Sequence, residues 1–303
     1  MTFFIMGGTG FVGRHLIAWL QKQGHSVMAL ARKEKSLARL PDGCRAVLGD
    51  PLRSGDWQQQ AREADVLINL VGRSIMTRWN DASKKQILET RILSTRMAVE
   101  ALVPERPAVL INANAVGYYP QGRNSVVTEK DPAGEGFLAE VCQIWQDEAN
   151  KAMAKNARVV IARFGTVLGA DGGAMAQMLP VFRKGLGGRL GSGRQWFAWI
   201  HILDLCRALE FAARNKNLSG PINCCAPQSV TNAEFTKAMG RTLHRPVILP
   251  VPAFLIRLAL GDVAQAVLQG AKIVPKALEN AGFAFRFPNL EGALEDIVGE
   301  KTS

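Results

Sequence analysis

The sequence predicts an α/β protein whose doubly wound parallel sheet is joined to a smaller, mainly helical C-terminal lobe. Strand-type apolar runs alternate with helical patterns through residues 1–165, which is typical of a parallel sheet covered by helices on both sides. The run over 65–72 is almost continuously apolar, as expected for a strand buried on both faces. The chain also opens with a strand, a glycine turn and a helix, the order that begins many such sheets.

The elements can be placed in order along the chain. The first strand is the apolar run before Gly7, and an amphipathic helix pattern extends from Phe11 to about Gln21. Residues 196–205 indicate a strand entering a helix, and residues 247–303 indicate helix. The same periodicities predict strands at 26–31, 45–48, 108–113, 158–163 and 221–225, helices at 80–103, 137–155 and 233–244, and glycine-rich loops at 168–173 and 184–194.

This pattern predicts three regions: a nucleotide-binding domain over 1–165, a substrate lobe over 166–245 interleaved with it, and a small helical domain over 246–303. Hydrophobic residues make up 48% of the chain and charged residues 21%, which is a globular composition. We find no signal peptide and no run of about 18 uncharged apolar residues, so we expect no membrane segment. Five cysteines without a C-x-x-C pair predict a reducing compartment, cytoplasmic or organellar, and no metal site.

The glycine turn after the first strand is the strongest motif. Gly7-x-x-Gly10-x-x-Gly13 stands between a strand and a helix, which is the context of a dinucleotide phosphate site. Glycines let the backbone approach the diphosphate, and the free amides at the helix start point at its charge. The alternative is a plain tight turn. The cofactor-binding residues predicted here are Gly7, Thr9, Gly10, Phe11, Val12 and Gly13.

The end of the second strand favours NADP over NAD. NAD-specific sites place an acid about 20 residues after the glycine motif, for the ribose hydroxyls. This sequence has Arg32 there, with Lys33 beside it, and a guanidinium can pair with a 2′-phosphate. Alternatively, Arg32 is only a surface charge. Asp50, after the third strand, is a candidate for contacting the adenine.

Other charged and crevice-lining positions complete the predicted site. Leu70, Val71 and Gly72 end the fourth strand and would line the cofactor crevice. Arg91, between apolar helix turns, could reach the diphosphate or lie on the surface. Arg194, in the second glycine loop, is a better candidate than Arg163 for binding an anionic group of a small-molecule substrate.

The net charge of +11 suits an anionic ligand such as NADP. Nucleic acid is not expected, because the 37 Lys and Arg residues are spread along the chain without interleaved aromatics.

Taken together, several segments resemble the extended short-chain dehydrogenase/reductase superfamily, and more narrowly its atypical epimerase-family subgroup. The resemblance implies a Rossmann fold, bound NADP with Val167 near the nicotinamide, and a C-terminal substrate lobe. Leu249–Val298 is similar to the small C-terminal domain of that subgroup. The segments that carry the resemblance are Gly7–Gly13, Asn69–Gly72, Ala115–Tyr119, Gly185–Gly188 and Trp199–Asp204.

The superfamily's catalytic residues are missing from this sequence. The superfamily uses a Tyr as acid/base, a Lys four residues on, and a Ser or Thr that orients the substrate carbonyl. No Tyr-x-x-x-Lys occurs here: Phe137 stands at the Tyr position and Val141 at the Lys position. The Ser position falls near Asn114, which is therefore a candidate substrate-binding residue.

Two hypotheses about function follow. In the first, the protein is an NADP-dependent oxidoreductase or nucleotide-sugar epimerase whose acid/base is Tyr119, Tyr118 or His201. In the second, it binds NADP(H) without turnover, as a sensor or regulatory protein. Asp204 is expected to cap a helix, and either a monomer or a homodimer is compatible with the sequence.

Overall fold

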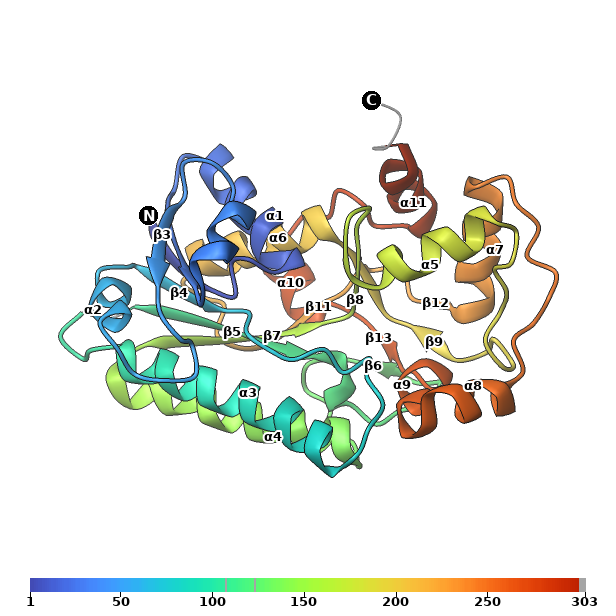
Figure 1. The fold of residues 1–303 in the computed structure, drawn as a ribbon, viewed down its shortest axis with the longest axis horizontal. Coiled ribbons are helices and arrows are strands. Elements are labelled where there is room, and N and C mark those ends of the chain that lie inside the picture. Colours follow the sequence, from blue (N-terminus) through green and yellow to red (C-terminus); the bar gives the residue numbers. More distant parts are fainter. Residues whose placement is uncertain (107, 123, 300–303) are drawn as a thin grey trace.

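The computed structural model describes residues 1–106, 108–122 and 124–299 and contains a seven-stranded parallel sheet (Figure 1). The strand order reverses between β1 and β4, as in a Rossmann fold, and the predicted fold class is confirmed. From one edge to the other the strands are β11 (Gly220–Cys224), β7 (Arg158–Phe164), β5 (Val109–Ala115), β4 (Val66–Asn69), β1 (Thr2–Met6), β2 (Ser26–Ala31) and β3 (Arg45–Leu48).

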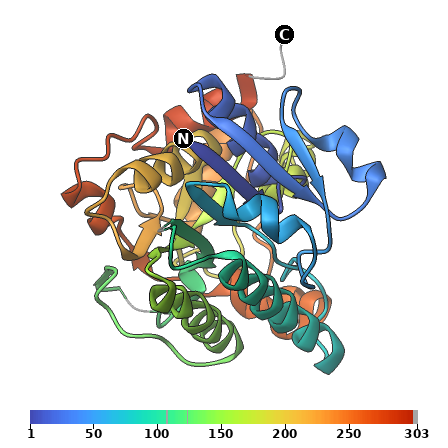
Figure 2. The ribbon, with the colours of Figure 1, turned by 90° about the vertical axis from the view of Figure 1, so that its left-hand side faces the viewer.

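Helices cover both faces of the sheet because side chains along each strand alternate between two cores. In β1, Phe3 and Ile5 join the core formed with α1 (Phe11–Lys22) and α6 (Ile202–Arg214). Phe4 and Met6 join the opposite core, formed with α2 (Trp57–Arg62), α3 (Asp81–Ala101) and α4 (Phe137–Asn150). Figures 1 and 2 show α3 and α4 side by side on one side of the sheet.

The second half of the molecule is built mainly from segments after β7. Its apolar core contains Phe182, Trp199, Phe235 and Leu294. Its elements are β8 (Thr166–Leu168), α5 (Gly173–Arg183), β9 (Trp196–Phe197), β10 (Trp199–His201), β12 (Val230–Thr231), α7 (Asn232–Thr242), α8 (Ala253–Leu260), α9 (Gln265–Leu268), β13 (Lys272–Ile273) and α11 (Leu290–Gly299). Helix α10 (Lys276–Asn280) instead packs against β11, and its Leu278 belongs to the core of the sheet. No helix in the described ranges is both long and apolar enough to cross a membrane.

Asp204, in the first turn of α6, joins the C-terminal segment to that helix. Its carboxylate is fully buried and accepts hydrogen bonds from the backbone amides of Arg286 at 2.9 Å and Phe287 at 2.8 Å. Arg207 Nη1 donates to the same carboxylate at 2.8 Å. Asp204 was expected to cap α6, but His201 is the capping residue, and Asp204 instead binds amides 82 and 83 residues further along the chain.

Most other differences from the predicted elements lie at element ends or in the C-terminal part. The expected strand over 65–72 is shorter, and the predicted helix over 137–155 ends as α4 at Asn150 and continues as a 3₁₀ turn. Residues 247–303 are not helical throughout, because β13 pairs with β6 (Val126–Val127) and residues 283–289 contain no helix. Helices α2 and α5 were not predicted; α2 is only six residues long, and α5 contains Pro180.

Candidate functional site

The glycine turn forms a cradle at the carboxyl ends of β1 and β4. Gly7 has φ +84°, a conformation that side chains other than glycine rarely adopt, and a Cβ there would lie 3.0 Å from the Leu70 carbonyl carbon. A Cβ on Gly13 would overlap Gly7 O and the Gly8 backbone. The turn and the helix start therefore pack at a distance that only glycine allows, at the switch point where such sheets bind ligands.

The first turn of α1 presents unused backbone donors. Its first helical hydrogen bond runs from Arg14 N to Gly10 O at 3.0 Å, so the amides of Phe11, Val12 and Gly13 have no helical carbonyl to bond. Gly10 caps the helix without a side chain, and no acidic residue stands in the first turn. Free amides, the positive end of the helix dipole and a side-chain-free approach together fit a diphosphate.

A loop from the second half of the molecule covers the start of α1. The Phe11 ring packs against Gly172 and Gly173, where an added Cβ would collide with it. Asp171 accepts a hydrogen bond from His15 at 2.8 Å and one from Arg14 at 3.4 Å. Phe11 thus contributes its amide to the cradle, while its ring holds the loop that follows β8, the strand that contains Val167.

The ends of β2 and β3 bring Arg32, Lys33 and Asp50 to the same edge of the sheet. Ala31 pairs with Leu48, and Gly49 N donates to Ala31 O at 3.1 Å. Arg32 and Lys33 are exposed, and neither side chain makes an ion pair or hydrogen bond within the described ranges. Asp50 accepts from Leu52 N through Oδ1. The two cations are therefore available to an anion at this edge.

Arg91 lies beside the end of β4. Its guanidinium donates to the carbonyls of Ile87 at 2.9 Å and Arg73 at 3.0 Å and stands 5.0 Å from the Trp145 ring centre. A Cβ on Gly72 would lie 3.3 Å from Arg91 Cζ, so Gly72 lets the backbone pass against this guanidinium. Burial lowers the pKa of Arg91, because desolvation disfavours the charged form. Arg91 thus lies next to Gly72 in the predicted crevice and also fixes the loop after β4.

A buried polar network fixes the end of β4, and the sequence analysis missed it. Asn69 is fully buried; its Nδ2 donates to Thr95 Oγ1 at 3.0 Å and Asn112 Oδ1 at 2.9 Å, and its Oδ1 accepts from Val71 N at 3.1 Å. Such satisfied networks hold a backbone segment in one conformation. The signal in the sequence was an asparagine inside each of two otherwise largely apolar runs, after Ile68 and after Ile111.

The positions that carry the superfamily's catalytic groups hold packing residues. The Phe137 ring meets Trp79 edge-on at 5.0 Å, with Lys84 Nζ 5.6 Å from the Phe137 ring centre. Val141 is 3% exposed. Asn114 is 2% exposed and is tied to the fold, because it donates to Cys142 O at 3.0 Å and accepts from Ala115 N at 2.8 Å. Asn114 therefore joins β5 to α4, which speaks against its expected role in binding substrate.

Tyr119 is not placed to act as an acid/base. It is 1% exposed; its hydroxyl donates to Asn223 Oδ1 and accepts from Arg163 Nη1, both at 2.7 Å. Burial raises the pKa of Tyr119 to about 12, although Arg163 opposes this shift. Arg163 itself is 2% exposed and also donates to Gln146 Oε1 at 2.7 Å, so it belongs to this internal network and does not face an anionic substrate.

His201 is also fixed inside the fold. It is 3% exposed, its Nδ1 accepts from Leu203 N at 3.2 Å to cap α6, and its ring lies 4.0 Å from the Phe287 ring centre. Nε2 is 3.4 Å from Asp296 Oδ2 but forms no hydrogen bond of good geometry. Burial lowers the pKa of His201 to about 4, so the ring is neutral near pH 7, contrary to its expected role in proton transfer.

Tyr118 and Arg194 remain as candidate groups. Tyr118 is half-buried at the carboxyl end of β5, with the Arg163 guanidinium 3.5 Å from its ring centre. Its hydroxyl makes no hydrogen bond within residues 1–106, 108–122 and 124–299. Arg194 is exposed in the second glycine loop, and its side chain forms no hydrogen bond or ion pair in the same ranges. Of the predicted catalytic and substrate-binding residues, Tyr118 and Arg194 are therefore the two whose side-chain polar groups form no hydrogen bond or ion pair within the described ranges.

Comparison with known proteins identifies the family. The model of the NAD-dependent epimerase/dehydratase family matches residues 3–225, and that of a domain of unknown function, DUF1731, matches residues 251–297. Epimerase family protein Mb2239 of Mycobacterium bovis is 41% identical over 293 residues, covering 96% of this chain and 95% of the relative. The chloroplastic SDR39U1 homologue of Arabidopsis thaliana is 38% identical over 305 residues, covering 98% and 87%.

A solved structure agrees with these matches. The structure of human epimerase family protein SDR39U1, isoform 2, with NADPH has a TM-score of 0.87 and 32% identity, and 99% of each chain is covered. The chain therefore belongs to the NAD-dependent epimerase/dehydratase family, as an atypical short-chain dehydrogenase/reductase with a C-terminal DUF1731 domain.

Proposed function

We propose that the protein binds NADP(H). The free backbone amides in the first turn of α1 would hold the diphosphate, and the adenosine 2′-phosphate would lie beside Arg32 and Lys33. The observation that carries this proposal is the first turn of α1, where the unused amides of Phe11–Gly13 stand over a glycine cradle. The exposed cations at the end of β2, whose side chains have no ion pair within the described part of the chain, support the phosphorylated form of the coenzyme. The human relative, whose structure contains NADPH, supports the same choice.

Replacing Arg32 by Ala tests the choice of coenzyme. We expect the variant to bind NADPH about tenfold or more weakly, with NADH affinity changed much less, because a charge-assisted contact of about 1.5–3 kcal/mol is lost. Calorimetric titration of both coenzymes measures the ratio. The matched control is Lys216→Ala, an exposed cation in the loop before β11 at the opposite edge of the sheet. Equal loss for both coenzymes, or the same loss in the control, would contradict the assignment.

For chemistry, we propose hydride exchange between NADP(H) and a carbonyl or alcohol, as in an oxidoreductase or a nucleotide-sugar epimerase. The bound coenzyme supplies or accepts the hydride. The Tyr118 hydroxyl holds the proton that the carbonyl oxygen gains or the alcohol loses. Tyr118 is favoured because the hydroxyl of Tyr119 is saturated by Arg163 and Asn223. Exposed Arg194 is the proposed contact for an anionic group of the substrate.

A second function, coenzyme binding without turnover, is favoured by one observation: Phe137 and Val141 leave the superfamily's acid/base positions without an ionisable group. Following the absorbance of the reduced nicotinamide with a panel of nucleotide sugars and carbonyl compounds separates the two. If the protein is an enzyme, Tyr118→Phe should lower turnover by about 10²–10⁴-fold, whereas a folded Tyr119→Phe variant should keep it. NADPH binding without turnover on any substrate would support the sensor.

A reducing compartment is part of the proposal, with the cytoplasm as the expected one. All five cysteines are free thiols, and Cys142, Cys206, Cys224 and Cys225 are buried. Burial raises the pKa of the Cys142 thiol to about 11, which keeps it protonated and unreactive at neutral pH.

A further inference from the structure

The C-terminal domain carries an apolar ridge that no described part of the chain covers. Ile248 and Leu258 are each 82% exposed, which is far above the exposure usual for such side chains. Of the eight residues of α8, Ile256 is the only one that is buried. We call these residues the α8 ridge, and they are Ile248, Leu249, Phe254, Leu255 and Leu258.

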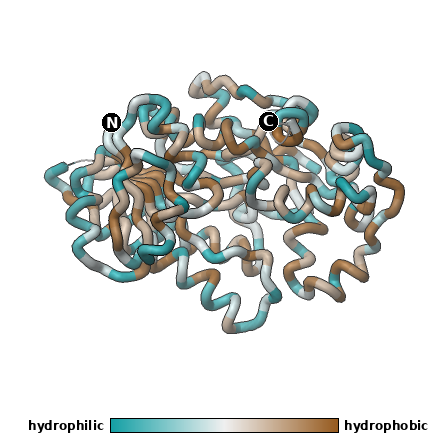
Figure 3. Tube along the Cα trace, turned by 45° about the horizontal axis from the view of Figure 1, so that its top comes forward, coloured by the Kyte–Doolittle hydropathy of each residue, from teal (hydrophilic) through white to brown (hydrophobic). Residues whose placement is uncertain are grey.

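The ridge is held in place by a neighbouring segment. Val251 N donates to Arg189 O and Gly191 N donates to Val251 O, both at 2.8 Å, so the strand-like stretch before α8 is fixed at both sides of Val251. Gly188 packs so closely that a Cβ there would overlap Leu249 O. Figure 1 places α8 at one corner of the molecule, and Figure 3 shows it as a largely hydrophobic coil there. The segment leading into α8 is therefore held in one position by residues 188–191.

The segments that form and support the ridge contain no acidic residue. Residues 172–203 and 235–261 lack Asp and Glu entirely. The next acid along the chain, Asp262, is bonded to Lys84 at 3.3 Å. These two segments contain eight basic residues, Arg183, Lys184, Arg189, Arg194, Lys237, Arg241, Arg245 and Arg257.

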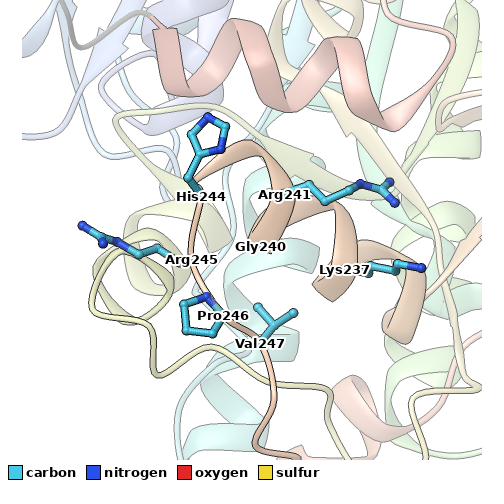
Figure 4. Close-up of a pocket in the computed structure, with 7 residues that line it drawn as sticks. All are labelled: Lys237, Gly240, Arg241, His244, Arg245, Pro246 and Val247. Atoms are coloured by element: carbon cyan, nitrogen blue, oxygen red, sulfur yellow. The ribbon is translucent and has the colours of Figure 1, made fainter.

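A basic hollow adjoins the ridge along the chain. It has a volume of about 590 Å³, lies at the end of α7, and leads through Pro246 and Val247 directly to Ile248 (Figure 4). Lys237, Arg241 and Arg245 line it, and Arg241 donates to Glu291 at 2.9 Å. Lys237 and Arg245 form no ion pair within the described residues. From the hollow to α8, exposed basic and apolar side chains therefore follow one another along the chain, and an occupant that spans this stretch must offer both apolar contact and negative charge.

We propose that the α8 ridge and its basic surroundings bind peripherally to a membrane surface that contains anionic lipids. A rigid two-turn helix exposing Phe and Leu side chains, bordered by Arg and Lys, has the chemistry of an interfacial anchor. A second copy of the chain is disfavoured, because the same face would bring like charges together. Nucleic acid is disfavoured, because the ridge is mainly aliphatic and offers little surface for stacking bases. The expectation of no membrane rested on long spanning runs, which such a surface does not need.

Flotation of the full-length protein with vesicles tests this proposal. Vesicles of phosphatidylcholine mixed with phosphatidylglycerol should carry the protein, vesicles of phosphatidylcholine alone should not, and added salt should release it. Leu258→Ser and Arg245→Glu, both on exposed positions, should each weaken partitioning by about tenfold. The matched control is Met153→Ser, which removes an apolar side chain that is 58% exposed in the nucleotide-binding half.

Several results would overturn the proposal. These are no flotation with the anionic vesicles, equal flotation with both compositions, or equal losses in the Met153→Ser control. Analytical ultracentrifugation of the same samples measures the oligomeric state. A dimer that Leu258→Ser dissociates would assign the ridge to contact with a second copy of the chain. Binding to a soluble acidic amphipathic peptide, without binding to vesicles, would assign it to a protein partner.

Discussion

Replacing Asp204 by Ala is expected to lower the free energy of unfolding by about 3–5 kcal/mol. The carboxylate is fully buried and binds the amides of Arg286 and Phe287 and the guanidinium of Arg207. Without this carboxylate, the two backbone amides and the partly buried guanidinium lose their hydrogen-bond acceptor. Each buried donor left without a partner costs about 1–3 kcal/mol. Urea or thermal unfolding, followed by circular dichroism, measures the change.

The control for this prediction is Asp262→Ala. Asp262 is 63% exposed and, among the described residues, forms an ion pair with Lys84 alone, so its loss should cost less than about 1 kcal/mol. A loss below about 1 kcal/mol for Asp204→Ala, or equal losses for the two variants, would mean that the C-terminal segment is held mainly by apolar packing.

Replacing Gly13 by Val is expected to weaken NADPH binding by about ten- to a hundredfold or abolish it. The new side chain would overlap Gly7 O and the Gly8 backbone, so the glycine turn must move away from α1 and the amides of Phe11 and Val12 lose their alignment. Fluorescence or calorimetric titration of NADPH measures the effect. Gly292→Ala, in α11 with only a side-chain atom at 3.4 Å, is the control and should bind normally. Normal binding by a folded Gly13→Val variant would remove the turn from the site.

The sheet could be predicted from the sequence because each strand is a short apolar run bounded by turn residues, a pattern that is visible without knowledge of the rest of the fold. The ranges expected for β2 and β3 are those observed, since continuous apolar runs between turns have few alternative structures. The sequence also located the glycine cradle, because that motif depends on local backbone conformation and on the order strand, turn, helix.

The interior environment of single side chains could not be predicted in this way. Tyr119 and Asn223 are 104 residues apart, so nothing near Tyr119 in the sequence reveals that its hydroxyl is bonded. His201 was a reasonable acid/base by its ordinary pKa, and only the packing of Phe287 and α11 against it shows otherwise. Likewise, the sequence does not reveal that the side chains of the α8 ridge are exposed, because apolar residues at helical spacing are usually buried.

Amide hydrogen exchange tests most directly whether the free amides in the first turn of α1 hold a coenzyme diphosphate. Peptides spanning residues 7–16 are followed by mass spectrometry with and without saturating NADPH. Bound NADPH should strongly slow exchange in these peptides, because the amides of Phe11–Gly13 gain phosphate acceptors. Unchanged exchange at residues 7–16 in a protein that demonstrably binds NADPH, or no binding of NADPH at all, would contradict it.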